Sequence, residues 1–143
     1  MNRFVNWMVL LAGLWWAVPT VAADFVVVVN PEVAISGLTK DDLKRIYQGE
    51  KTEWPGDGAI VPFDQDAGSP LRAAFSKEVL GTTVAEVQTF WINKKMTGGL
   101  TGPKVFRSST LVKKFVARTP GAIAYLAADE VDDTVKVVAV SGL

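Results

Sequence analysis

The 143-residue sequence contains no cysteine and no histidine. Without cysteine, no disulfide stabilises the fold, and the core must hold by packing alone. Without either residue, the commonest metal ligands are missing, and Ser69 has no histidine to activate it as a nucleophile. Asp64 and Asp66 lie two residues apart but lack the further oxygen ligands that a calcium site needs, so they indicate a solvated turn. We expect no metal, no cofactor and no enzyme activity.

An excess of charge of either sign is also missing, since 15 basic residues balance 15 acidic ones. Nothing in this balance favours a nucleic-acid partner. A phosphate-binding loop of the nucleotide type is absent as well, because the Gly68 to Arg72 segment has neither its lysine nor its spacing.

The N-terminal segment has the pattern of a signal peptide. A basic start at Arg3 precedes an apolar run over 4–18 and the small residues Ala22 and Ala23. The run is shorter than the roughly 20 residues that span a bilayer. We therefore expect a signal peptide over 1–23 and a soluble periplasmic domain over 24–143 without a stable membrane anchor. An uncleaved anchor is the alternative, because Trp15 and Trp16 suit a membrane interface.

Strand and helix signals alternate along the rest of the chain. Apolar runs predict strands over 25–29, 59–63, 104–106, 122–126 and 135–140. Capping residues predict helices starting after Thr39, Ser69, Thr82 or Thr83, and Ser108 or Ser109. In the third helix we expect these residues to face inward: Val84, Val87, Phe90, Trp91 and Met96. The alternation predicts an α/β fold with helices packed on a mostly parallel sheet.

The segment from Asp64 to Ser69 joins a strand to a helix. Ser69 suits the N-cap, and Pro70 suits the first helical position because its missing N–H costs nothing there. A helix start has unpaired donors and a partial positive charge, and ligands of open sheets collect beyond the carboxyl ends of strands. The segment therefore predicts either an anion site or a simple helix cap.

The combined pattern resembles a known family. It is similar to the phosphate-specific substrate-binding proteins of bacterial ABC transporters, within the type II periplasmic binding protein superfamily, and especially to their short, single-lobe relatives. The resemblance covers 25–140 and rests on Leu38-Thr39, Leu43, Ile46-Tyr47, Gly49, Trp54, Gly58, Gly68-Ser69, Phe75 and Thr119-Pro120-Gly121-Ala122-Ile123-Ala124-Tyr125. It implies one lobe of a fold that closes two lobes over phosphate.

The resemblance assigns the phosphate contacts to Gly68 and Ser69, with the backbone N–H groups of Leu71 and Arg72. The family's Gly-Thr after the serine is Pro70-Leu71 here, and its phosphate-pairing arginine is Gln65. A neutral amide cannot form the charge-assisted pair of that arginine. Arg72 would replace it only if its side chain turned back over the helix start.

Two functions follow from these observations. The first is a periplasmic binding module for a small oxyanion, with phosphate favoured and an ABC permease or a second copy as partner. The second is an interaction module that keeps the lobe but binds a protein or its own copy. The missing lobe and missing arginine favour the second, as would exposure of Trp54 or Trp91.

Overall fold

The structure is a computed structural model and describes residues 24–56 and 58–143. Within these residues one six-stranded sheet has the order β2-β6-β1-β5-β3-β4. Its strands are β1 (Phe25–Val29), β2 (Gly37–Thr39), β3 (Val61–Gln65), β4 (Lys104–Phe106), β5 (Ala122–Ala127) and β6 (Lys136–Ser141). β3 is parallel to β4 and β5, and β2 is parallel to β6, whereas β1 is antiparallel to β5 and β6. The predicted α/β fold with a mostly parallel sheet is confirmed.

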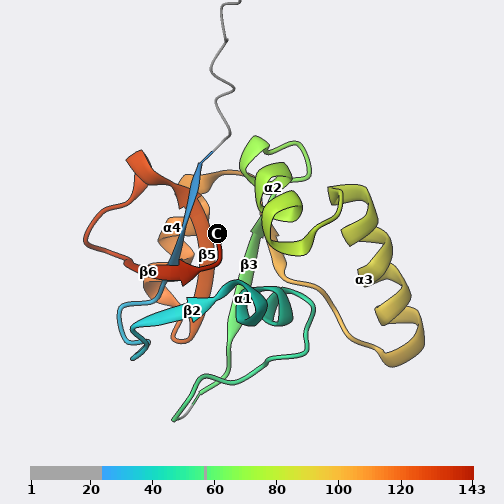
Figure 1. Cartoon of the computed structure of the whole chain (residues 1–143), viewed down its shortest axis with the longest axis horizontal. Coiled ribbons are helices and arrows are strands. Elements are labelled where there is room, and N and C mark those ends of the chain that lie inside the picture. The colour runs from blue at the N-terminus through green and yellow to red at the C-terminus, as the bar shows by residue number, and fades with distance from the viewer. Residues whose placement is uncertain (1–23, 57) are drawn as a thin grey trace, which may run out of the picture.

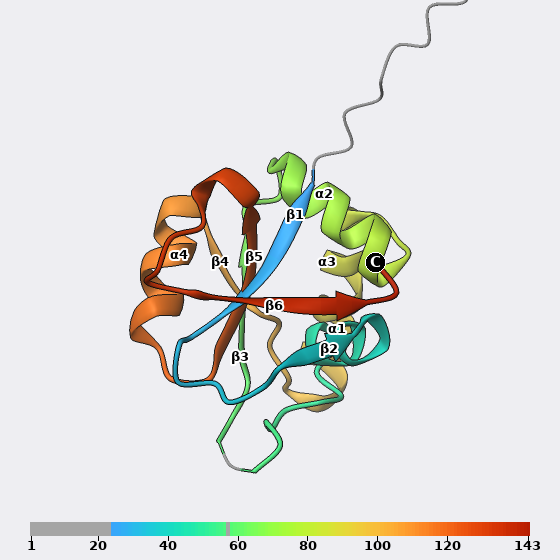
Figure 2. The same cartoon turned by 60° about the vertical axis from the view of Figure 1, so that its left-hand side comes forward.

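Helices cover both faces of the sheet (Figures 1 and 2). They are α1 (Lys40–Tyr47), α2 (Pro70–Phe75), the π-helix η1 (Ser76–Leu80), α3 (Val84–Gly98), α4 (Ser109–Arg118) and the 3₁₀-helix η2 (Ala128–Glu130). α1 and α2 share one apolar cluster with Val27 and Val29, and α4 shares the other with Val28. The valine run of β1 is therefore buried on both faces, as its lack of alternation predicts.

Local capping signals set the helix starts. Thr39 and Thr83 each form a capping box, with Asp42 and Glu86 respectively. The helix that follows Ser69 continues through η1 and ends at Gly81, which has the positive φ of 66° that glycine tolerates best. The predicted helix starts are confirmed.

One strand prediction needed correction, and one strand was missed. β3 spans 61–65 rather than 59–63, because pairing with β4 places Asp64 opposite Val105 and Gln65 opposite Phe106. β2 was not predicted, since three residues carry too little periodic signal and form a strand only by pairing with β6. The correction to β3 places two polar side chains inside the sheet.

The inward face predicted for α3 is largely wrong. Only Val87 of the predicted set is buried, and Met96 is 80% exposed. Figure 1 shows α3 to one side of the sheet, beyond α2 and β3. Trp91 contacts Gly102 in the loop after the helix, so α3 packs against this loop rather than along a strand.

In the part of the chain that the structure describes, no helix has the length and apolarity needed to cross a bilayer. The predicted signal peptide lies outside the described residues.

Candidate functional site

β3 ends in two buried polar side chains that point to opposite faces of the sheet. Asp64 is 5% exposed and Gln65 is 3% exposed. Asp64 meets the Tyr125 hydroxyl on the α1 and α2 face, and Gln65 meets Ser109 of α4 on the other face. This arrangement follows from the alternation of side chains along a strand. Each face therefore has its own polar centre.

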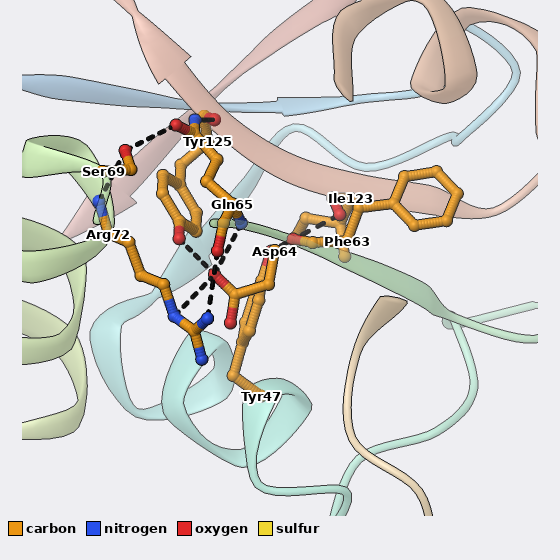
Figure 3. Close-up of polar contacts among 8 residues, drawn as sticks. All are labelled: Tyr47, Phe63, Asp64, Gln65, Ser69, Arg72, Ile123 and Tyr125. Carbon is orange, nitrogen blue, oxygen red and sulfur yellow. Dashed lines mark hydrogen bonds and ion pairs between the residues drawn. The ribbon is translucent and has the colours of Figure 1, made fainter. Parts of the chain in front are cut away.

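Gln65 forms the centre on the α4 face. Its Oε1 accepts hydrogen bonds from Ser69 Oγ at 2.8 Å and Ser109 Oγ at 3.4 Å. Its Nε2 donates to the Tyr125 carbonyl at 2.9 Å, and Figure 3 shows Gln65 beside Ser69. The two serines belong to the starts of α2 and α4. Both helix starts, with their partial positive charge, therefore lie beside one buried amide.

The backbone around Ser69 is only partly engaged. Ser69 Oγ accepts from the Arg72 N–H at 3.4 Å, and the Ser69 N–H donates to the Asp66 carbonyl at 2.9 Å. The N–H groups of Gly68 and Leu71 have no acceptor among residues 24–56 and 58–143. Gly68 is exposed, and Ser69 and Leu71 are partly buried. The open donors are thus the Gly68 and Leu71 amides, whereas the cap engages the Arg72 amide.

The Arg72 side chain turns back toward β3 but reaches the face opposite Gln65. It is 5% exposed, and its Nε lies 3.5 Å from Asp64 Oδ1. Its Nη1 donates to the Gln65 carbonyl oxygen at 3.0 Å (Figure 3). Arg72 therefore pairs with Asp64, on the face opposite the Gln65 side chain and its serine contacts.

The sequence predicts a solvated turn for both Asp64 and Asp66. This prediction is confirmed for Asp66, which is exposed, and is wrong for Asp64, which is buried. Asp64 Oδ1 accepts from the Tyr125 hydroxyl and from the Gln65 N–H, in addition to pairing with Arg72. Burial, together with the Asp64 charge, raises the pKa of Tyr125 and of Tyr47 well above the ordinary tyrosine value. Asp64 is thus part of a buried network.

Sequence reasoning missed the contact of Ser109 with Gln65 and the position of Arg107 at the same edge of the sheet. Ser108 is the α4 cap, and Ser109 instead reaches Gln65. Arg107 is exposed and follows Phe106, whose carbonyl accepts from the Asp66 N–H at 2.9 Å. The signal that could have found them is topological, because the carboxyl ends of parallel strands β3 and β4 meet at one edge.

Trp54 and Trp91, whose exposure would favour an interaction module, differ in burial. Trp54 is buried, and its Nε1 donates to the Gly121 carbonyl at 2.9 Å. Trp91 is half-buried, between Gly49 and Gly102. Trp54 is therefore a core residue and forms no part of an exposed surface.

The chain belongs to the PBP (periplasmic binding protein) superfamily: a family model described as a PBP superfamily domain matches residues 11–142. The chain is 34% identical over 121 residues to the phosphate-binding protein PstS of Bacillus subtilis (strain 168). That alignment covers 80% of this chain and 35% of PstS. The resemblance predicted from the sequence is confirmed.

Solved structures show the same relationship. One is a Clostridium perfringens protein assigned as a phosphate ABC transporter substrate-binding protein, with bound phosphate. It has a TM-score of 0.69 and 26% identity, over 83% of this chain and 45% of that one. An ABC-type phosphate transport receptor from Vibrio cholerae has a TM-score of 0.64 and 21% identity, over 83% and 46%. This chain thus spans less than half the length of these relatives.

Proposed function

We propose that the chain is an exported binding module for a phosphate-like oxyanion, held over the Gly68–Ser69 turn. The observation that carries the proposal is the meeting of two serine hydroxyls, Ser69 and Ser109, at the starts of α2 and α4. The open amides of Gly68 and Leu71 add donors at the same turn. The proposed role is binding rather than catalysis, because the relatives are phosphate-binding proteins.

The expected affinity is low. Gln65 stands where the family has its phosphate-pairing arginine and supplies no charge. A hydrogen bond to a charged group contributes about 1.5–3 kcal/mol, so its loss weakens binding roughly ten- to a hundredfold. Arg107 is exposed at the β4 to α4 connection and is the cation that we propose as a partial replacement.

Calorimetric titration with phosphate and with sulfate, at matched ionic strength, tests the proposal. We expect Gln65→Arg to tighten phosphate binding, and Ser69→Ala and Arg107→Gln to weaken it. Thr83→Ala is the matched control, because it deletes the cap of α3 without touching the turn. It should lose about 1 kcal/mol of stability, as Ser69→Ala does, and bind phosphate like the parent. Absence of binding by all these proteins at millimolar anion would refute the oxyanion function.

The proposal includes a partner and a compartment. A single lobe leaves the anion turn open to water, where electrostatic contacts are weak, so a second copy or a transporter permease would cover it. Light scattering with and without phosphate, and cross-linking in cells, should detect one of these partners. Intact mass from a periplasmic extract should show a chain starting at Asp24. A strict monomer with no cross-linked partner, or a full-length mass, would contradict these points.

A second candidate is an interaction module that has lost anion binding. The exposure of Ile92 (59%) and Met96 (80%) on α3 favours it, whereas buried Trp54 does not. If phosphate fails to bind but Met96→Lys abolishes a cross-linked partner, this second function replaces the first.

A further inference from the structure

A pocket lies on the sheet face opposite the Gln65 side chain. Its volume is about 600 Å³, within the usual range for small-molecule sites. Its wall and floor include Asp64 of β3, Arg72 of α2, Val105 of β4, and Trp91, Ile92 and Lys95 of α3. We refer to this cavity as the α3 pocket.

The floor of the α3 pocket is a buried guanidinium with unused donors. Arg72 donates through Nη1 to the Gln65 carbonyl, and its Nε faces Asp64 Oδ1 at 3.5 Å in an ion pair that is too long for a hydrogen bond. Figure 3 shows the remaining terminal nitrogen pointing away from Asp64 and Gln65. Buried donors are normally satisfied, so the remaining terminal nitrogen of this guanidinium, beside a pocket, points to an acceptor on a ligand.

The charges of the α3 pocket fit one negative charge. Asp64 contributes −1, and Arg72 and Lys95 contribute +1 each, so their sum is +1. Asp64 already balances one of the two cations. The second negative charge of a dianionic ligand would therefore have no cation to pair with. A carboxylate has two oxygens, one for the guanidinium and one for the ammonium.

The remaining walls are apolar. Ile92 is 59% exposed and Val105 is 48% exposed, so a hydrocarbon group would remove apolar surface from water. Trp91 is held in place by the loop, because a Cβ at Gly102 would lie 2.8 Å from its Cγ. The indole is therefore a fixed aromatic wall beside the charged floor.

We propose that the α3 pocket binds a small monocarboxylate with an apolar body. The carboxylate lies between Arg72 and Lys95, and the body lies against Trp91, Ile92 and Val105. The pocket is separate from the oxyanion turn, because Asp64 and Gln65 point to opposite faces of the sheet. It does not depend on phosphate binding.

Phenylacetate is the probe, titrated by calorimetry and by the NMR signal of the Trp91 indole N–H. Phenylacetamide keeps the ring without the charge, and acetate keeps the charge without the ring. We expect both to bind at least about tenfold more weakly than phenylacetate, since each lacks one half of the interaction. Phosphate should neither displace phenylacetate nor shift the Trp91 signal.

Two neighbouring lysines provide matched variants. Lys95→Gln should weaken phenylacetate binding about two- to fivefold, a modest loss because the lysine is exposed to solvent. Lys94→Gln should leave it unchanged, because Lys94 lies over the Phe90 ring at 5.5 Å rather than in the pocket. Neither variant removes a buried group, so both should fold, and both should bind phosphate like the parent.

Three results would overturn the proposal. They are equal binding of phenylacetate and phenylacetamide, equal effects of the two lysine variants, and an unmoved Trp91 signal at millimolar phenylacetate. Displacement of phenylacetate by phosphate would instead place both anions at one site and refute the separation of the two.

Discussion

Replacing Arg72 by methionine tests how far the polar network holds the domain together. Methionine keeps an unbranched apolar stem of similar reach but removes the guanidinium. Asp64 would then keep its burial and lose its cation, which lies 3.5 Å away in the parent. Both side chains are less than a tenth exposed, so water cannot readily replace the missing charge.

The expected loss of stability in Arg72→Met depends on the hydrogen bonds that Asp64 keeps. Breaking a buried ion pair by removing one partner costs about 3–5 kcal/mol. Asp64 still accepts from the Tyr125 hydroxyl and from the Gln65 N–H, so we expect the lower end, about 3 kcal/mol. In a domain of this size that loss lowers the melting temperature by roughly 10 °C or somewhat more.

A double-mutant cycle separates the pair from the packing. Asp64→Asn removes the other charge and keeps an oxygen that can accept from Tyr125. We expect Asp64→Asn combined with Arg72→Met to recover about 2 kcal/mol relative to Arg72→Met alone, because no uncompensated charge remains buried. Urea unfolding followed by circular dichroism measures all four proteins. Additive losses, or a loss below about 1 kcal/mol for Arg72→Met, would refute the reasoning.

Two further predictions concern the aromatic residues. Tyr47 and Tyr125 are the sequence's only tyrosines, and their raised pKa values keep them protonated in the folded state. Their contribution to stability is full below pH about 10 and falls as the pH rises further. Because the tyrosines ionise more readily in the unfolded chain, tyrosinate absorbance should appear only with unfolding. Titration near pH 10 with unchanged circular dichroism would contradict this. Gly102→Ala should displace Trp91 and red-shift its fluorescence, at a cost near 1 kcal/mol because α3 has little buried surface. An unshifted emission would contradict that account.

Local signals in the sequence were sufficient for much of the fold. The valine run of β1 predicts burial on both faces, and the caps at Thr39 and Thr83 predict two helix starts. The Gly68–Ser69 turn was predicted in its place between a strand and a helix. Each of these depends on residues close in the chain, whose chemistry acts before any tertiary contact forms.

The rest depends on register between distant segments. The face that Asp64 points to is fixed only when β3 pairs with β4, which extends the strand through Gln65. The contact of Ser109 with Gln65 likewise needs α4 to start beside that strand end. The exposure of α3 could not be predicted from its apolar residues, because the sequence does not show that the helix packs against a loop instead of the sheet.

The geometry at Gln65 adds a reason for weak anion binding beyond the missing charge. Its Oε1 accepts from Ser69 and Ser109, so an anion that takes both hydroxyl donors must break two existing hydrogen bonds. Arginine at this position would remove the competing acceptor, and its side-chain N–H groups would remain able to donate to the Tyr125 carbonyl. Gln65→Arg should therefore gain more than an ion pair alone, exceeding about tenfold in phosphate affinity. Gln65→Met removes the acceptor without adding charge and should give a smaller gain. If calorimetry finds that Gln65→Met binds phosphate no better than the parent, the hydroxyls are not held back by Gln65, and the charge alone limits affinity.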